Sequence, residues 1–154
     1  NILNCSKDYK IKQLFFASSS SVYGNNKHYP WHENTNSDKP LSFYAATKKS
    51  NEIIAQAYSN IYNLKCTGLR FFTVYGEYGR PDMALHKFTD SIIKKKTISI
   101  YNYGKNIRDF TNIHDVTNSL IKLLNTKYKQ NSNFEIFNIG SNKPLSILKL
   151  IKLL

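Results

Sequence analysis

Short apolar segments alternate with longer amphipathic segments along the chain, and this alternation restricts the fold more than any other feature. The apolar runs are too short for helices and predict buried strands at residues 13–17, 66–72 and 134–139. The amphipathic segments repeat apolar side chains every three or four residues and predict helices at residues 42–62, 83–95 and 115–124. Strands that alternate with helices are typical of an α/β fold with a largely parallel sheet.

The segments between these elements carry weaker signals. Residues 97–101 predict one more short strand, and residues 145–154 predict the beginning of an amphipathic helix. Residues 25–40 are polar and contain two prolines, and residues 76–81 are rich in Gly and Pro, so both segments predict loops. Ser42 stands where the N-cap of the following helix is expected.

The length and composition restrict the class of protein. A chain of 154 residues has the size of one ordinary domain. No apolar run reaches the roughly 18 residues that a membrane span requires, and no secretory leader is recognisable. Two cysteines, Cys5 and Cys66, are too few for a disulfide scaffold or a Cys-rich zinc site. We therefore expect a cytoplasmic protein with no membrane partner, whose cysteines are reduced thiols in the core.

The net charge of +12 allows an anionic partner such as a nucleic acid or a phosphorylated substrate. However, most of the basic residues are scattered lysines, whereas a nucleic-acid-binding face is usually clustered and richer in arginine. We therefore expect no nucleic-acid partner. The histidines at positions 28, 32 and 86 lack the spacing of metal ligands, so no metal site is expected either.

Four consecutive serines, Ser18 to Ser21, directly follow the first predicted strand and precede Val22-Tyr23-Gly24. Ligands of open α/β sheets bind beyond the carboxyl ends of the strands, where these hydroxyls would contact a polyhydroxylated substrate. The alternative is a serine-rich turn that only caps the strand.

Tyr44 and Lys48 lie four residues apart and therefore on one face of the predicted helix. An ammonium group near a phenol favours the phenolate, which makes the tyrosine usable as a general base and acid. The alternative is a surface pair on an amphipathic helix.

In combination, the serine after a strand and the Tyr-x-x-x-Lys segment about 25 residues later resemble the short-chain dehydrogenase/reductase superfamily. The more specific resemblance is to its extended, sugar-nucleotide-modifying branch, and above all to the UDP-glucuronate 4-epimerase group. It rests on the segments ASSSSVYG, YAATK, LRFFTVYGEYGRPDMAL, YNYGKNIRDFTNIHDV and FNIGSNKPLSIL, and it covers essentially residues 1–154.

The resemblance implies an α/β fold in which the chain is the C-terminal part of a Rossmann-like doubly wound parallel sheet plus most of a small substrate-binding lobe. Residues 1–75 are expected to form the second half of the NAD-binding domain and residues 76–132 mainly the UDP-sugar lobe. Residues 133–154 are expected to supply a return strand and the start of a truncated helix. We therefore expect an internal piece of a longer protein, whose family begins with a Gly-rich, pyrophosphate-binding half that this chain lacks.

The resemblance also implies roles for individual residues. Ser19, Tyr44 and Lys48 are the expected catalytic residues, and NAD is the expected cofactor. Tyr44 takes the proton of the sugar O4 hydroxyl, Ser19 hydrogen-bonds that oxygen, and NAD⁺ reversibly accepts the C4 hydride, so that a 4-keto sugar forms transiently. Tyr44, Lys48 and Phe71 are expected to contact the cofactor.

Four residues are expected to contact the substrate besides Ser19. They are Ser20, Thr73, Arg80 and Arg108. Arg80 would pair with the carboxylate of a uronic acid, or else be a surface residue or a diphosphate ligand. Arg108 would bind the UDP phosphates, or else form an ion pair with Asp109. Related 4,6-dehydratases carry Asp and Glu after the catalytic hydroxyl; Ser20 and Ser21 stand there instead, which disfavours dehydration.

The resemblance thus predicts an NAD-dependent UDP-sugar 4-epimerase that converts UDP-glucuronate to UDP-galacturonate for polysaccharide synthesis, as a homodimer. Three alternatives stay open: an epimerase for UDP-hexose or UDP-N-acetylhexosamine, a non-catalytic truncated remnant, and a basic binding module. The chain by itself is expected to be inactive.

Overall fold

The computed structural model describes residues 1–125 and 132–154, which form two compact units. Among the described residues, unit 1 consists of Asn1–Phe71 and residues 132–139, and unit 2 consists of Phe72–Asn125 and Gly140–Leu154. The observed division therefore follows Phe71, whereas the sequence placed a boundary after residue 75. The boundary predicted after residue 132 falls within unit 1, which continues to Ile139.

Unit 1 contains a three-stranded sheet of β1 (Leu14–Ser19), β2 (Cys66–Phe71) and β5 (Phe134–Ile139). The strand order is β1-β2-β5, and both pairings are parallel. Ser19, Phe71 and Ile139 stand in register at the last position of their strands, so the three carboxyl ends meet at one edge. The three predicted strands and the α/β fold class are thereby confirmed.

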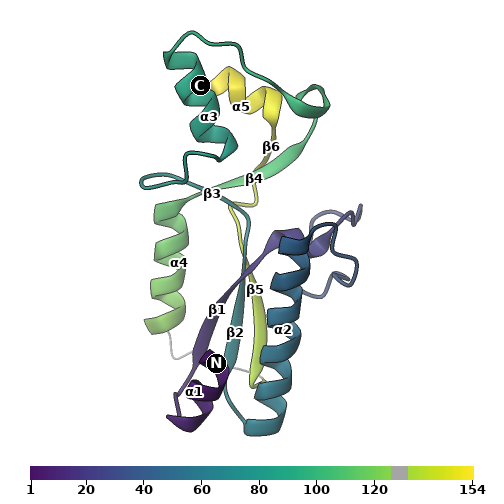
Figure 1. Cartoon of the computed structure of the whole chain (residues 1–154), viewed down its shortest axis with the longest axis vertical. Helices are drawn as coiled ribbons and strands as arrows, with labels where there is room; N and C mark the ends of the chain where they lie inside the picture. The colour runs from purple at the N-terminus through teal and green to yellow at the C-terminus, as the bar shows by residue number, and fades with distance from the viewer. Residues whose placement is uncertain (126–131) are drawn as a thin grey trace. The chain divides into compact units, whose positions relative to one another are not determined.

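The helices of unit 1 are α1 (Ile2–Asp8), a short 3-10 helix η1 (Ser20–Tyr23) and α2 (Phe43–Tyr62). Helix α2 runs along one face of the sheet (Figure 1). The core cluster between them contains Ala55, Leu64 and Cys66, and burial raises the pKa of the Cys66 thiol to about 11. Cys5 is exposed, so the prediction of two core thiols is wrong for this cysteine because α1 turns it toward solvent.

Unit 2 contains a second sheet and the remaining helices of the described residues. Its strands are β3 (Thr73–Tyr75), β4 (Ile107–Asn112) and β6 (Pro144–Ser146). Its helices are α3 (Ala84–Ile93), α4 (Ile113–Asn125), α5 (Ile147–Leu153) and the 3-10 helix η2 (Tyr101–Gly104). Strand β4 lies in the middle, parallel to β3 and antiparallel to β6.

One predicted element is wrong in unit 2. Residues 97–100 form no strand, and Tyr101 begins η2, because this segment pairs with no neighbouring strand in the described part of the chain. Strand β4 was not predicted, since its sequence IRDFTN mixes charged and apolar residues without a clear period of two.

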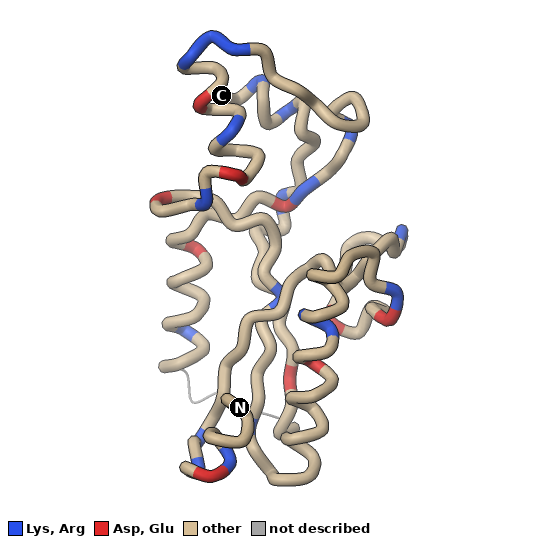
Figure 2. The backbone as a smooth tube through the Cα atoms, in the orientation of Figure 1, with Lys and Arg blue, Asp and Glu red and all other residues tan. Residues whose placement is uncertain are grey.

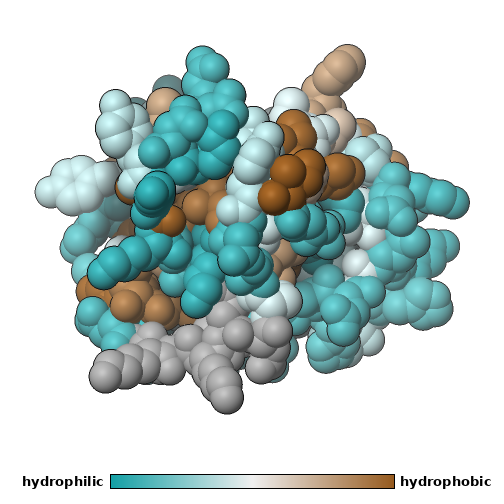
Figure 3. Space-filling model, turned by 90° about the horizontal axis from the view of Figure 1, so that it is seen from below, coloured by the Kyte–Doolittle hydropathy of each residue, from teal (hydrophilic) through white to brown (hydrophobic). Residues whose placement is uncertain are grey.

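Unit 1 has an unpaired strand edge and several apolar side chains that are exposed to solvent. Within the described residues, β1 pairs only with β2, so its other edge is unpaired. Phe43, Ile53 and Ile61 on α2 are 93%, 57% and 70% exposed. Figure 3 likewise shows hydrophobic side chains at the surface among hydrophilic ones. Such edges and faces are normally covered in a stable domain.

Two expectations from the sequence concern the distribution of basic residues and the presence of membrane-spanning helices. Lys and Arg are distributed along both units, with the longest basic run directly after α3 (Figure 2). No helix among residues 1–125 and 132–154 combines the length and the apolar character needed to cross a bilayer.

The N-cap of α2 provides a first test of the fold. The backbone N–H of Ala45 donates to the Ser42 hydroxyl oxygen at 3.1 Å. We expect Ser42→Ala to lower the free energy of unfolding by about 1 kcal/mol, because one N–H of the first helical turn loses its partner. Urea denaturation of the protein that contains this chain would measure the change, and Ser42→Asp, which keeps a capping oxygen, is the matched control. Equal stability of Ser42→Ala and the parent would contradict the capping role.

Candidate active site

Ser19 is the last residue of β1 and lies at the edge where the parallel strands end. Its hydroxyl oxygen accepts hydrogen bonds from the backbone N–H and the side-chain hydroxyl of Ser21, at 3.2 and 2.9 Å. A hydroxyl oxygen that accepts two hydrogen bonds still has its own proton to donate. Ser19 is therefore oriented by Ser21 and can donate to an oxygen of a bound molecule.

The turn after η1 explains why a glycine, Gly24, follows Val22 and Tyr23. Gly24 has a φ of +59°, and a Cβ at this position would lie 2.3 Å from the backbone oxygen of Lys39. Only glycine permits both the left-handed conformation and this close approach. Gly24 thus lets the loop of residues 25–40 return to the end of β1.

Tyr44 and Lys48 occupy the first two turns of α2. The Tyr44 side chain is 55% exposed, and the Lys48 Nζ lies 5.7 Å from the centroid of its ring. The same Nζ donates to the backbone oxygen of Ala17 at 3.1 Å. Ala17 lies two residues before Ser19 on β1, so the structure brings the predicted Tyr-Lys pair to the carboxyl end of this strand.

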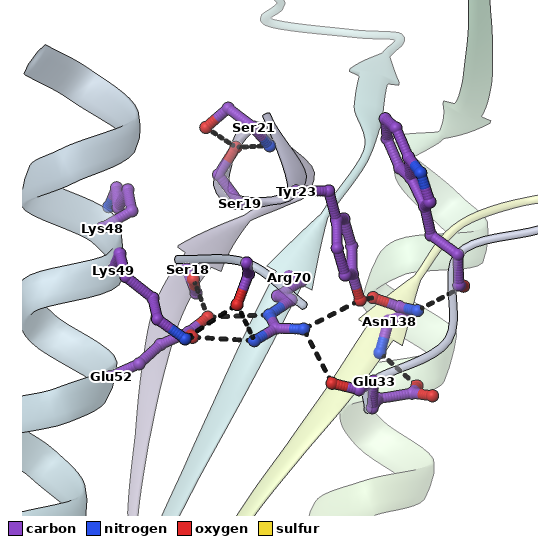
Figure 4. A network of polar contacts seen from close by, with 12 residues as sticks. Ser18, Ser19, Ser21, Tyr23, Glu33, Lys48, Lys49, Glu52, Arg70 and Asn138 are labelled. Atoms are coloured by element: carbon purple, nitrogen blue, oxygen red, sulfur yellow. Dashed lines mark hydrogen bonds and ion pairs between the residues drawn. The ribbon is translucent and has the colours of Figure 1, made fainter. Parts of the chain in front are cut away.

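A buried ion pair lies directly below this edge of the sheet (Figure 4). The Arg70 guanidinium donates to both carboxylate oxygens of Glu52, each at 2.8 Å, and the Ser18 hydroxyl donates to Glu52 Oε1 at 2.6 Å. All three side chains are buried. Burial raises the pKa of the Glu52 carboxyl, but hydrogen bonds from Arg70 and Ser18 outweigh burial, so the net pKa lies below its ordinary value.

The same arginine connects the strands to the loop of residues 25–40. Arg70 donates to the Tyr23 hydroxyl at 2.9 Å and to the backbone oxygen of Glu33 at 3.0 Å. Tyr23 in turn donates to Asn138 Oδ1 at 2.7 Å, and the Asn138 N–H donates to the Glu33 carboxylate. Burial raises the pKa of Tyr23 while hydrogen bonding with Arg70 opposes the rise; the net pKa is raised, so Tyr23 stays neutral and can donate.

The sequence contained signals for part of this network that were not used. Glu52 lies four residues after Lys48, and this spacing places it on the same side of α2 as Tyr44 and Lys48. Glu52 is only 3% exposed, whereas Tyr44 is 55% exposed, and a buried carboxylate needs a partner. Arg70 interrupts an otherwise apolar strand, which indicates a buried, paired charge. Only the fold shows that these two residues pair.

The two other predicted residues of unit 1 lie at the same edge of the sheet. Phe71 is the last residue of β2 and stands in register with Ser19. Ser20 is the first residue of η1. The structure thus brings Ser19, Ser20 and Phe71 together at the strand ends, close to where Lys48 contacts β1.

Unit 2 contains a pocket of about 550 Å³. Three of the predicted substrate residues line it: Thr73 from β3, Arg80 from the following loop and Arg108 from β4. Its wall also includes Met83, Leu85, Lys87 and Phe88 from α3 and the segment before it. A pocket of this volume with two guanidinium groups suits an anionic ligand of the size of a nucleotide.

The two arginines of the pocket differ in their partners. Arg80 forms an exposed, two-point ion pair with Asp82, with Nε to Oδ1 at 3.0 Å, and this pair lowers the pKa of Asp82. Arg108 donates to the backbone oxygen of Ile107 at 2.8 Å. Asp109 instead accepts hydrogen bonds from the N–H and the hydroxyl of Ser141, and no ion pair joins it to Arg108 in the described ranges.

A comparison with protein families supports the reading of these segments. Residues 1–140 match the model of the NAD dependent epimerase/dehydratase family. The chain is 45% identical over 166 residues to protein CapI of Staphylococcus aureus, covering 99% of this chain and 50% of that protein. It is 43% identical over 167 residues to UDP-glucuronate 4-epimerase 5 of Arabidopsis thaliana, covering 100% of this chain and 38% of that protein.

The fold is also found in solved structures. UDP-glucuronic acid 4-epimerase from Bacillus cereus, in complex with UDP-glucuronic acid and NAD, superimposes with a TM-score of 0.88. The two sequences are 35% identical, and the match covers 96% of this chain and 46% of that one. The chain thus spans half or less of the length of these relatives.

Proposed function

Since the chain belongs to the NAD dependent epimerase/dehydratase family, we propose that the protein containing it is a UDP-sugar 4-epimerase that converts UDP-glucuronate to UDP-galacturonate. The observation that carries this proposal is the placement of Ser19, Tyr44 and Lys48 around the carboxyl end of β1. These residue types can move a proton at a sugar hydroxyl.

The residues at the end of β1 fit a nicotinamide cofactor. An ammonium group has three N–H donors, and Ala17 takes one from Lys48, so the same nitrogen can donate to the hydroxyls of a ribose. The exposed Tyr44 hydroxyl lies on the same helix face. Lys48 and Tyr44 would therefore hold the nicotinamide ribose, with Phe71 beside them. NAD, when bound, supplies the hydride acceptor.

The proton chemistry follows from the side chains. Tyr44 is proposed as the general base that takes the proton from the O4 hydroxyl of the sugar, with the Lys48 ammonium 5.7 Å from the centroid of its ring. Ser19, whose oxygen already accepts from Ser21, donates a hydrogen bond to the same sugar oxygen and keeps its proton. Both residues would thus hold O4 during the reversible oxidation of C4 to a ketone, for which NAD, when bound, would accept the hydride and return it to the opposite side.

The residues after Ser19 favour epimerisation over dehydration. Elimination of water needs a proton donor for the leaving hydroxyl, and a carboxylic acid is the usual group. Ser20 and Ser21 occupy the two positions concerned, and the Ser21 hydroxyl is engaged with Ser19. We therefore propose epimerisation for this protein, whose family description includes both epimerases and dehydratases.

The substrate assignment rests on the pocket of unit 2. Arg108 and Thr73 are proposed to bind the UDP part, and Arg80 the carboxylate of the uronic acid. Asp82 shows that Arg80 presents its fork to a carboxylate at this position, and a substrate carboxylate would replace it. An epimerase for UDP-hexose or UDP-N-acetylhexosamine uses the same chemistry with a different pocket, and this alternative stays open.

Replacement of Arg80 separates the two substrate classes. In the protein that contains this chain, we expect Arg80→Leu to lower kcat/KM for UDP-glucuronate about 100-fold, because a charge-assisted, two-point interaction is lost. The same variant should change kcat/KM for UDP-glucose by less than about threefold. Steady-state assays with both substrates measure this difference, with Arg80→Lys as the control that keeps the charge. Equal losses on both substrates would contradict the uronate assignment.

The isolated chain of 154 residues is expected to be poorly soluble and without epimerase activity. The unpaired edge of β1 and the exposed apolar side chains of α2 favour association with other copies. Sedimentation, thermal melting and an activity assay with UDP-glucuronate and NAD test this expectation. A soluble monomer that melts cooperatively and shows turnover would contradict it.

A non-catalytic remnant of such an enzyme is the second candidate, because the chain spans half or less of its relatives. Sequencing the gene on both sides of the region encoding Asn1 to Leu154 distinguishes the two. An in-frame strand followed by a Gly-rich loop on the N-terminal side supports the enzyme, whereas a stop codon or frameshift supports the remnant.

We also propose that the whole protein is located in the cytoplasm and forms a homodimer. The exposed side chains of α2, such as Phe43 and Ile53, offer an apolar surface for association. Analytical ultracentrifugation of the whole protein measures the oligomeric state directly.

A further inference from the structure

Two side chains of α2, one turn apart, bind two consecutive residues at the end of β1. Lys48 Nζ donates to the backbone oxygen of Ala17 at 3.1 Å, and Glu52 Oε1 accepts from the Ser18 hydroxyl at 2.6 Å. Ser19 is the next residue along the strand. The helix that carries Tyr44 is thus tied at two points to the strand that carries Ser19.

Glu52 cannot rotate freely to another partner. Its side chain is 4% exposed, and Arg70 of β2 donates to both of its oxygens in a two-point ion pair. A side chain held at both oxygens keeps one orientation, which aims Oε1 at the Ser18 hydroxyl. Ser18 is 2% exposed, so no solvent competes for this hydrogen bond.

We propose that Glu52, held by Arg70, is a positioning residue that fixes the end of β1 against α2 through Ser18 and thereby sets Ser19 relative to Tyr44. The inference rests on the proposed epimerase function, because it assigns Glu52 a task only if Ser19 and Tyr44 act on one sugar oxygen. Glu52 and Arg70 themselves touch neither cofactor nor substrate in this assignment, since both are buried beneath the edge (Figure 4).

The physical reason is the sensitivity of proton transfer to distance. A displacement of about 1 Å between reacting groups costs on the order of 100-fold in rate. Two side-chain contacts between α2 and the final residues of β1 are described above. If the Ser18–Glu52 hydrogen bond is removed, the hydrogen bond from Lys48 to Ala17 remains of these two. Substrate binding depends on other residues, those of the pocket in unit 2, so the defect should fall on kcat and leave KM unchanged.

The test compares three single variants and one double variant of the protein that contains this chain, assayed with UDP-glucuronate and NAD. Ser18→Ala removes the link to β1 and leaves the Glu52–Arg70 pair intact. Glu52→Gln keeps an oxygen that can accept from Ser18 but weakens the pair with Arg70 that orients it. Tyr58→Phe is the control, because it removes a hydrogen bond of the same helix, from Tyr58 to Asn4 Oδ1 of α1 at 2.6 Å, which involves no residue of β1. For each variant, kcat is divided by the folded fraction measured by urea denaturation.

We expect Ser18→Ala to lower kcat per folded molecule about 10- to 100-fold with KM within about twofold, and Tyr58→Phe to leave both unchanged. Glu52→Gln should lower kcat less than Ser18→Ala, and the double variant should lose less than the product of the two single effects, because both changes act on the same link. If Glu52→Gln does not fold, Ser18→Ala alone decides the question.

Unchanged kcat per folded molecule in Ser18→Ala would overturn the positioning role. So would additive losses in the double variant. If the parent protein itself has no epimerase activity, the proposed function fails first, and this outcome is visible before any variant is made.

Discussion

Replacing Tyr44 with Phe is expected to lower kcat for UDP-glucuronate epimerisation about 10²- to 10⁴-fold, the range typical for loss of a general acid–base group. The phenol oxygen is the atom proposed to take and return the O4 proton, and phenylalanine removes only this atom. The remaining site residues keep their geometry, so KM should stay within a few-fold of the parent value. Chromatographic separation of the two UDP-uronic acids after timed incubation measures the rate.

The stability of this variant should be unchanged within about 0.5 kcal/mol, because the Tyr44 side chain is half-exposed at the start of α2. Tyr62→Phe is the matched control, since it makes the same substitution at the other end of the same helix. Full activity of Tyr44→Phe would remove the basis of the proposed mechanism. A loss that accompanies unfolding would assign Tyr44 a structural role instead.

The largest effect on stability is expected for Arg70→Met. Arg70 is 3% exposed and forms a two-point ion pair with Glu52, which is equally buried. Its removal leaves the Glu52 carboxylate with the Ser18 hydroxyl and with Lys49, whose Nζ is 3.6 Å away. Breaking one partner of a buried pair costs about 3–5 kcal/mol, so urea denaturation should show a loss of this size.

Arg80→Met is the matched control for this experiment. It makes the same substitution in an ion pair whose side chains are 75% and 55% exposed. Exposed pairs contribute about 0–1 kcal/mol, so this variant should unfold close to the parent. Similar losses in both variants would contradict the assignment of the Arg70–Glu52 pair as the buried electrostatic centre of unit 1.

The difference in the free energy of unfolding between Arg70→Met and the parent should also depend on pH. The pKa of Glu52 is held below its ordinary value in the folded protein, so its ionised form stabilises the fold above the ordinary carboxyl pKa. This contribution is lost as the pH falls through the folded pKa. The cost of Arg70→Met should therefore shrink toward acidic pH, as unfolding curves between neutral and acidic pH would measure.

The amino-acid sequence by itself determined those strands, helices and site residues whose signals lie within a few neighbouring positions. The three strands of unit 1 are short segments rich in apolar residues, and α2 begins at a capping serine and repeats its apolar residues with a helical period. The placement of Ser19 after a strand and of Tyr44 and Lys48 on one helix face needs only a few neighbouring residues. These local patterns also carried the resemblance to the family that the comparison then confirmed.

The tertiary structure decided what depends on contacts between distant parts of the chain. Strand β4 exists because it pairs with β3 and β6, whereas residues 97–100, with a better strand sequence, pair with nothing in the described ranges. The pairing of Glu52 with Arg70 likewise joins residues that are separated by a helix end and a loop. Burial, hydrogen-bond partners and strand pairing arise only when such segments meet in space, so a local pattern contains no record of them.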